Sequence, residues 1–166
     1  NFSRFTQEVF RTFGNTYLKA KILPSLYFQT ELGVDYLSQN EEGYFQTQTV
    51  RNQTRATRGL GSNTGAFITN VNTQSYFGYD KQFGKSHLNA TLGMQYQQSR
   101  AKYNFTEGTE FPSNSYQKIA SAATKSGGSS SQSDFRFLSY FARANYSLND
   151  RYLFSASGRI DGSSRF

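Results

Sequence analysis

Alternation with a period of two residues constrains this chain more than any other feature of its sequence. Apolar or aromatic residues stand at every second position, and Asn, Gln, Ser, Thr or charged residues stand between them, in six separate stretches. The stretches are residues 10–22, 26–36, 71–79, 88–96, 138–148 and 152–160. Successive side chains of a β-strand point to opposite faces, so this pattern predicts strands with one apolar and one polar face. No stretch sustains a helical period, which predicts an all-β fold.

Composition agrees with strands and excludes several classes of site. Aromatic residues make up 17% of the 166 residues, as 12 Tyr and 16 Phe without Trp, and aromatic side chains favour strands. Cysteine is absent, which excludes disulfides, a thiol nucleophile and thiolate metal sites. No run approaches the ~18 apolar residues of a membrane-spanning helix. The net charge of +7 permits anionic partners such as lipid phosphate.

The connections between the expected strands alternate between short and long. Tight turns are expected at "ILPSL", "QFGKSH" and "SLNDRY", and long polar loops at residues 37–69 and 99–134. Bacterial outer-membrane barrels have short periplasmic turns on one rim and long extracellular loops on the other. This order favours an antiparallel up-and-down transmembrane barrel segment over a soluble or secreted β-sandwich that binds glycans or other surfaces, which stays open as the alternative.

The C-terminal stretch "SYFARANYSLNDRYLFSASGRIDGSSRF" resembles the SusC/RagA family of TonB-dependent outer-membrane transporters from Bacteroidetes. The family typically shows a Tyr-Phe-x-Arg-x-Asn-Tyr strand, an Asp-Arg-Tyr turn and an Arg-x-Asp-Gly-Ser-Ser-Arg-Phe ending. These stand here at residues 140–146, 150–152 and 159–166, and residues 14–36 are similar to an earlier hairpin of the family. The middle of the chain fits by pattern rather than by motif.

The resemblance implies that residues 1–166 are part of the β-barrel domain of a TonB-dependent receptor. It implies a plugged barrel of about 22 strands, of which this chain would supply about six. The plug and the N-terminal, TonB-contacting segment are expected to be absent from the chain, which would then be an internal piece. The implied function is active import of oligosaccharides or peptides across the Gram-negative outer membrane. The implied partners are the TonB complex, a SusD-like surface lipoprotein, and outer-membrane lipid with lipopolysaccharide.

The residues that could carry catalysis or metal binding are few. His87 is the only histidine and has no neighbouring cluster of ligands in the sequence, so a structural or solvated role is expected. Glu41 and Glu42 are expected on a solvated loop rather than as an acid–base pair. No phosphate-binding loop or nucleophile elbow is present. We expect no enzyme activity, no cofactor and no metal, and the sequence identifies no substrate-binding residue.

Two loop segments have distinctive compositions. Arg51, Arg55 and Arg58 lie in "VRNQTRATRGLG", where contact with lipopolysaccharide or the lid lipoprotein competes with simple solvation, which is the favoured interpretation. Nucleic acid is not expected as a partner, because aromatic and basic residues fall on opposite strand faces. Residues 124–133, "TKSGGSSSQS", predict a flexible loop tip.

Pairing requires that apolar positions share one face, which predicts the length of each turn. Ile22 and Leu26 have the same parity and predict an odd loop, "LPS"; Tyr146 and Tyr152 predict an odd turn of three or five residues. Between Tyr79 and Leu88 the loop must be even, and a two-residue turn at "GK" (84–85) fits. The expected polar, lumen-facing side chains are Tyr17, Lys19, Gln29, Glu31, Asn72, Gln74, Asn89, Gln95, Arg143, Asn145, Arg159 and Asp161.

Overall fold

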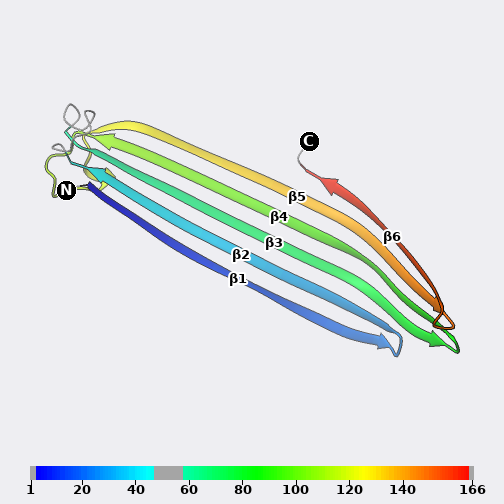
Figure 1. Ribbon diagram of the computed structural model, residues 1–166. Coiled ribbons are helices and arrows are strands. Elements are labelled where there is room, and N and C mark those ends of the chain that lie inside the picture. The colour runs from blue at the N-terminus through cyan, green and yellow to red at the C-terminus, as the bar shows by residue number, and fades with distance from the viewer. Residues whose placement is uncertain (1–2, 47–57, 165–166) are drawn as a thin grey trace. The chain divides into compact units, whose positions relative to one another are not determined.

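The computed structural model of the protein describes residues 3–46 and 58–164. These residues form one six-stranded sheet in which each strand is hydrogen-bonded to its neighbours in chain order (Figure 1). The strands are β1 (Ser3–Leu23), β2 (Leu26–Phe45), β3 (Leu60–Phe83), β4 (Ser86–Thr109), β5 (Thr124–Leu148) and β6 (Tyr152–Ser163). A single 3-10 turn, η1 (Ile119–Ser121), interrupts the connection between β4 and β5.

The sheet confirms the expected all-β, up-and-down architecture. Its order β1-β2-β3-β4-β5-β6 is that of consecutive hairpins, and the described residues contain no second sheet to pack against it. A two-layer sandwich needs such a second sheet, so the sandwich alternative does not describe this part of the chain. Within the same residues, no helix is long and apolar enough to cross a membrane.

The strands are longer than the sequence pattern predicts. β1 to β5 contain 20 to 25 residues each, and they extend through most of the two segments that were expected to be long loops. Apart from the three tight turns, β4 and β5 are separated by residues 110–123, and β2 ends at Phe45 whereas β3 begins at Leu60. The prediction failed because it followed apolar alternation, whereas a strand with water on both faces needs no apolar residues to form its backbone ladder.

The prediction of a flexible loop tip at residues 124–133 is wrong. This Gly- and Ser-rich stretch is the first part of β5. The Ser126 hydroxyl donates to Glu107 Oε1 at 2.9 Å, and the Thr124 hydroxyl donates to Glu110 Oε2 at 2.6 Å. Partners on β4 and just beyond it therefore hold a segment whose own composition disfavours a strand.

The chain divides into two compact units, to which each of β1 to β5 contributes. The first unit comprises Asn1–Thr12, Tyr36–Thr69 and Arg100–Ser133. The second comprises Phe13–Asp35, Asn70–Ser99 and Asp134–Phe166. The first unit contains the 110–123 connection, and the second contains the three tight turns.

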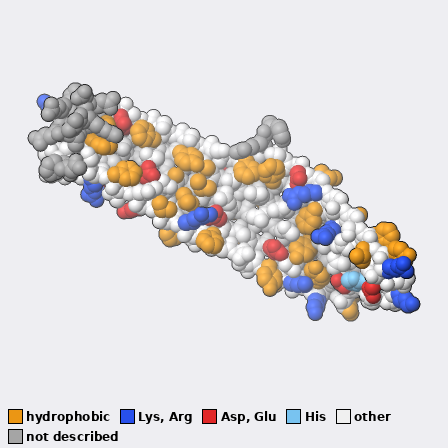
Figure 2. All heavy atoms as spheres, viewed as in Figure 1, with side chains coloured by type: hydrophobic (Ala, Val, Ile, Leu, Met, Phe, Trp, Pro, Cys, Tyr) orange, Lys and Arg blue, Asp and Glu red, His pale blue; other side chains and the backbone are white. Residues whose placement is uncertain are grey.

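The first unit buries two large side chains, and apolar residues elsewhere are widely exposed. Tyr44 and Phe111 are the buried hydrophobic residues among those described, at 2% and 5% exposure. Leu18 and Ile160, by contrast, are 67% and 76% exposed. Figure 2 shows hydrophobic side chains spread over the visible surface. Apart from the contact of Tyr44 with Phe111, the described residues therefore bury almost no apolar side chain among themselves.

The turn between β3 and β4 confirms the predicted two-residue loop. β3 ends at Phe83 and β4 begins at Ser86, with Gly84 and Lys85 between them. Gly84 has φ +58°, a conformation that glycine adopts without strain and that the first position of a type II′ turn requires.

The turn between β5 and β6 confirms the predicted odd length. Leu148 pairs with Tyr152, which leaves a three-residue loop. Its first two residues, Asn149 and Asp150, have φ +54° and +51°. Asn and Asp tolerate this left-handed region better than other residues with a Cβ, which explains their place here.

The prediction of an odd loop "LPS" between β1 and β2 is wrong: β1 runs to Leu23 and β2 begins at Leu26, so the turn has two residues, Pro24 and Ser25. The parity on which that prediction depended nevertheless holds. The Phe10 and Tyr36 rings contact each other at 6.5 Å, and the Gln7 amide donates to Glu41 Oε1 at 3.1 Å. Even positions of β1 therefore meet even positions of β2, and odd meet odd.

The separation of the two faces is also confirmed where contacts test it. Register pairs Arg143 with Ser157 and Phe141 with Arg159, so both arginines occupy odd positions. Tyr146 pairs with Phe154 at even positions. The arginines therefore lie on the face opposite to these apolar side chains, as predicted.

Candidate functional site

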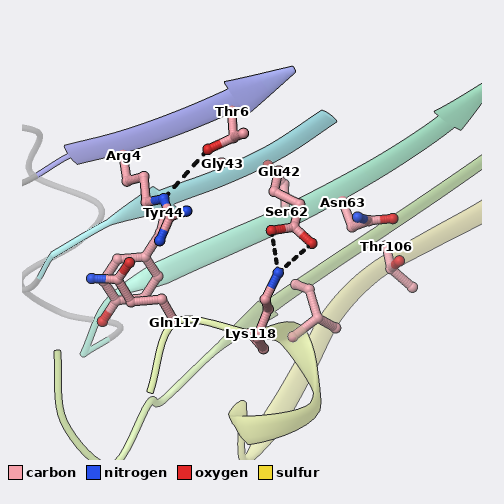
Figure 3. A pocket seen from close by; sticks show the side chains of 11 residues that line it. Arg4, Thr6, Glu42, Gly43, Tyr44, Ser62, Asn63, Thr106, Gln117 and Lys118 are labelled. Atoms are coloured by element: carbon pink, nitrogen blue, oxygen red, sulfur yellow. Dashed lines mark hydrogen bonds and ion pairs between the residues drawn. The ribbon is translucent and has the colours of Figure 1, made fainter. Parts of the chain in front are cut away.

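A polar cavity of about 190 Å³ lies in the first unit, between the strands and the 110–123 connection (Figure 3). Four strands and the connection contribute its charged and polar side chains. They include Arg4 and Thr6 from β1, Glu42 from β2, Ser62 and Asn63 from β3, Thr106 from β4, and Gln117 and Lys118 from the connection. Residues distant in sequence thus surround one space with charged walls.

An ion pair joins the connection to the sheet across this cavity. Lys118 Nζ lies 2.7 Å from Glu42 Oε1 and 2.5 Å from Oε2 (Figure 3). The Lys118 side chain is 72% exposed, so water screens the pair and its contribution to stability is small, at about 0–1 kcal/mol. The pair fixes the position of Lys118 more than it stabilises the fold.

An aromatic pair holds the same connection in place. The rings of Tyr44 and Phe111 meet edge to face at 5.0 Å, and the Tyr44 hydroxyl donates to Asn114 Oδ1 at 3.1 Å. The Phe111 amide donates to the Arg58 carbonyl at 3.1 Å. Burial raises the pKa of the Tyr44 hydroxyl above its ordinary value.

Two glycines on β3 and before it make room for this packing. Gly59 has φ +93°, a backbone conformation that residues with a Cβ rarely adopt. A Cβ on Gly61 would lie 2.6 Å from Phe111 Cζ. The Phe111 ring therefore fits against the strand because Gly61 has no side chain, whereas a Cβ on Gly59 would lie 3.1 Å from the Tyr44 hydroxyl.

Of the charged side chains that line the cavity, Arg4 has the fewest hydrogen-bond and ion-pair partner atoms. Its Nε donates to Thr6 Oγ1 at 3.3 Å (Figure 3). Within the described part of the chain, its terminal guanidinium nitrogens have no hydrogen bond or ion pair. Glu42, the carboxylate of the cavity wall, is occupied by Lys118.

Glu41 and Glu42 lie on β2 and not on the solvated loop that was expected. Neighbouring residues of a strand point to opposite faces, so the two carboxylates do not converge. Glu41 Oε1 accepts from Gln7 at 3.1 Å and from Gln39 at 2.6 Å, whereas Glu42 pairs with Lys118. The two carboxylates therefore do not lie together as an acid–base pair would.

His87 lies near the start of β4, beside the β3–β4 turn. Its Nε2 is 2.9 Å from Asp80 Oδ1, and Asn89 donates to Asp80 Oδ2 at 2.8 Å. The search of the described residues finds no group of three or more potential metal ligands. These contacts place His87 in a cross-strand polar cluster.

Of the three arginines expected on one loop, Arg51 and Arg55 lie outside the described residues. Arg58 is described, is exposed and has φ +49°. Its carbonyl oxygen receives the Phe111 amide, so the backbone of Arg58 helps to hold the 110–123 connection.

The residues of the C-terminal motif form a hydrogen-bonded network in the second unit. Arg159 Nη2 donates to Ser139 Oγ at 2.9 Å and to Gln95 Oε1 at 3.1 Å, and its Nε donates to Asp161 Oδ1 at 2.7 Å. Gln95 in turn donates to Asn72 Oδ1 at 3.1 Å. The network crosses β3 to β6. The sequence predicted a common face for most of these groups but did not predict the burial of Ser139, which is 1% exposed.

On the face of the sheet that carries the Arg159 network, aromatic rings lie against glycines. The sequence alone did not predict this feature. A Cβ on Gly78 would lie 2.2 Å from the Tyr27 ring, and one on Gly93 would lie 2.7 Å from Phe141 Cζ. The Tyr76 ring stands between, 6.2 Å from Tyr27 and 6.5 Å from Phe141. Glycine inside a strand often marks such a close approach, so Gly78 and Gly93 were the available signal.

The six strands in chain order have the architecture of a segment of an up-and-down barrel wall. No family model matches the chain. The TonB-dependent receptors P3 and P39 of Formosa agariphila are 29% and 28% identical to it over 158 and 163 residues. These matches include 92% and 94% of this chain and 15% of each relative, so the chain spans under a sixth of their length.

Solved structures of the RagAB peptide transporter, and of the RagAB peptide importer in its open-open state, have the same fold. The matches cover 99% of this chain at TM-scores of 0.85 and 0.83, with 19% sequence identity. They cover 19% and 18% of the matched chains. The resemblance to the SusC/RagA family is therefore confirmed, and Formosa fits the bacterial group that it implied.

Proposed function

We propose that this chain forms part of the barrel wall of an outer-membrane TonB-dependent importer. The observation that carries the proposal is the fold match to the RagAB structures over 99% of the chain. The two curated relatives are TonB-dependent receptors, which supports the same function. On this proposal, residues 1–166 belong to the barrel domain and have no enzymatic role, cofactor or metal.

The exposed apolar side chains support a location in the outer membrane. Leu92 and Phe154 are 64% and 61% exposed, and lipid would cover such side chains in a barrel wall. About 9–11 residues of a tilted strand cross the hydrocarbon layer, whereas β1 to β5 have at least 20. The long strands would therefore continue beyond the membrane, with the 46–59 and 110–123 connections outside the cell and the tight turns in the periplasm.

The polar face would line the lumen on the same proposal. Arg159, Gln95 and Asn72 are joined by hydrogen bonds, and these groups would be costly against lipid. In the parent protein they would contact water or the plug. We assign to them a structural role in the wall rather than contact with cargo.

The cargo and partners follow from the same resemblance. RagAB is named as a peptide importer, and the family imports oligosaccharides or peptides, so either class is proposed as cargo. A SusD-like lipoprotein would cover the extracellular mouth, and the TonB complex would act through the plug region. Lipopolysaccharide would surround the outer rim of the wall.

Uptake by cells that carry the full-length protein tests this function. Cells with the gene and an intact TonB system should accumulate labelled oligosaccharide or peptide, and the protein should fractionate with the outer membrane. Deletion of the gene and inactivation of TonB should each abolish uptake. Recovery of the intact parent from the soluble periplasm would refute the proposal, as would uptake that is independent of TonB.

A further inference from the structure

The apolar face of the second unit carries one charged side chain on β3 to β6. Odd positions of β3 and even positions of β4, β5 and β6 share this face, as the walls of an apolar hollow and the β5–β6 register show. Lys81 of β3 is the only charged residue at these positions. They fall in residues 71–83, 86–98, 138–148 and 152–162. Both strands that flank β3 are described, so no neighbouring strand is missing beside Lys81.

Lys81 lies beside an aromatic ring and has no acidic partner on this face. Its Nζ is 5.0 Å from the centre of the Phe83 ring. Asp80, the adjacent carboxylate, points to the opposite face, where His87 Nε2 lies 2.9 Å from its Oδ1. Within residues 3–46 and 58–164, Lys81 forms no ion pair. Its charge is therefore available to an anion from outside the sheet.

The turn that follows Lys81 adds a second cation. Lys85 is exposed, and its carbonyl accepts a hydrogen bond from the Asn149 amide at 2.7 Å, so the β3–β4 and β5–β6 turns lie side by side (Figure 1). Asp150 is the one acid of these two turns, and it is adjacent to Arg151. Lys81 and Lys85 are therefore left as a pair of cations without a matching carboxylate.

An apolar hollow of about 510 Å³ lies on the same face. It begins at Tyr79, two residues from Lys81, which is about 7 Å along a strand. Its volume is within the ~300–1,000 Å³ of typical ligand sites, and its walls are mainly apolar. One molecule with an anionic end and a hydrocarbon chain can therefore contact both the cations and the hollow.

Small residues form the floor of this hollow. The register places Ala144 opposite Ala156 and Ala142 opposite Gly158. The rows on either side carry larger side chains, which are Tyr146 with Phe154 and Tyr140 with Ile160. This difference in side-chain size makes a trough, in which a hydrocarbon chain has more atoms within contact distance than on an even surface.

We propose that this face binds an anionic phospholipid, with the phosphate at Lys81 and Lys85 and an acyl chain in the hollow. The inference rests on the proposed function, which places the face in the outer membrane and the tight turns at its periplasmic side. Aromatic rings and lysines that extend towards the interface are typical of the headgroup level. A zwitterionic headgroup carries its own ammonium, so the two lysines should prefer a lipid with net negative charge.

Lipid titration of the purified full-length protein in detergent, measured by native mass spectrometry, tests this preference. The probes are phosphatidylglycerol and phosphatidylethanolamine with identical acyl chains. Phosphatidylglycerol should bind at least about tenfold more tightly, because each lysine near an anionic lipid contributes about a fivefold gain in affinity.

Two substitutions and one control separate the headgroup contact from the acyl-chain contact. Lys81→Gln should weaken phosphatidylglycerol binding about fivefold and leave phosphatidylethanolamine binding nearly unchanged. Lys21→Gln is the matched control, because Lys21 also stands two residues before the end of its strand but on the opposite face, and it should change neither. Ala144→Leu fills the hollow and should weaken both lipids at least about threefold. All three variants should keep the heat-resistant gel mobility of a folded barrel.

Several results would overturn the inference. These are equal binding of the two lipids, unchanged affinity in Lys81→Gln, an equal loss in Lys21→Gln, or dissociation of a dimer by Ala144→Leu, which would show that a second copy fills the hollow. Each of these results would leave TonB-dependent uptake intact. Conversely, loss of TonB-dependent uptake with an unchanged lipid preference would count against the proposed transport function alone.

Discussion

At the scale of single residues, glycines decide how closely side chains can lie against this sheet. Gly78 and Gly93 lie beneath the rings of Tyr27 and Phe141, and a Cβ at either position would overlap its neighbours. Gly14 and Gly158, in contrast, have no atom within 4 Å of an added Cβ. Some glycines in these strands are therefore required by a close contact with a ring, and others are not. The contacts across the sheet show which are which.

Substitution of Gly93 by Ala should destabilise the full-length barrel by about 1–3 kcal/mol, the usual cost of overpacking. The new Cβ would lie 2.5 Å from Tyr76 Cβ and 2.7 Å from the Ser75 carbonyl oxygen, neither of which can rotate away. The measurement is the temperature at which the barrel loses its folded mobility on SDS gels. Gly158→Ala is the matched control and should leave that temperature unchanged; equal behaviour of the two variants would contradict the argument.

Arg159 is the centre of the motif network, and its loss should weaken the wall. Arg159→Met removes the partner of Ser139 Oγ, which is buried, together with the contacts to Gln95 and Asp161. The Ser139 hydroxyl keeps its hydrogen bond to Asp161. The loss is therefore that of the hydrogen bonds from the Arg159 guanidinium, and a hydrogen bond to a charged group contributes about 1.5–3 kcal/mol, so the unfolding temperature in detergent should fall. Arg143→Met removes the same charge at an exposed position of β5 and is the control. A smaller effect at Arg159 than at Arg143 would show that the network is not structural.

At the scale of elements, the 110–123 connection is an ordered part of the first unit although it has little regular structure. Its only helical turn is Ile119–Ser121. Phe111 packs on Tyr44, and Lys118 pairs with Glu42, so both of its halves touch β2. The folding of the connection therefore depends on contacts that are about 70 residues apart in sequence.

Phe111→Ala should release this connection without unfolding the barrel. A buried Phe→Ala change costs about 3–5 kcal/mol, and here the loss falls on a segment that few other contacts hold. Limited proteolysis or hydrogen exchange of the full-length protein should show faster cleavage or exchange at residues 110–123. Tyr116→Ala, at a position that is 62% exposed in the same segment, should not change it. Equal protection in both variants would refute the anchoring role.

At the scale of the whole molecule, residues 3–46 and 58–164 contain no second sheet to cover the apolar face and no strand that pairs with either edge of the sheet. Leu18, Leu92 and Phe154 are each more than 60% exposed. β1 and β6 are the edge strands of the sheet, and unpaired strand edges bind other strands. On the proposed function, lipid would cover the apolar face and neighbouring strands of a larger barrel would pair with both edges.

The 166 residues expressed alone without detergent should aggregate and bind no cargo. Large exposed apolar patches drive association, and two free edges add a second route. Size-exclusion chromatography should find the protein in the void volume or in the pellet. A monomer in plain buffer with a cooperative thermal transition would contradict this expectation and would require a fold in which the apolar face is covered.

The sequence by itself determined the all-β class, the order of the hairpins and the parity of two of the three tight turns. These follow from local rules, because the side chains of a strand alternate between its faces and paired strands must share an apolar face. The Leu148–Tyr152 pairing and the two-residue turn at Gly84 could be predicted on that basis.

Only the tertiary structure decided where the strands end and what the polar residues contact. Residues 124–133 have a composition that disfavours strands, yet Glu107 and the β4 backbone hold them in β5. The cavity beside Arg4 and Lys118 exists because a connection more than 100 residues from Arg4 folds onto β2. Such contacts have no local signature, since they depend on which distant residues the sheet brings side by side.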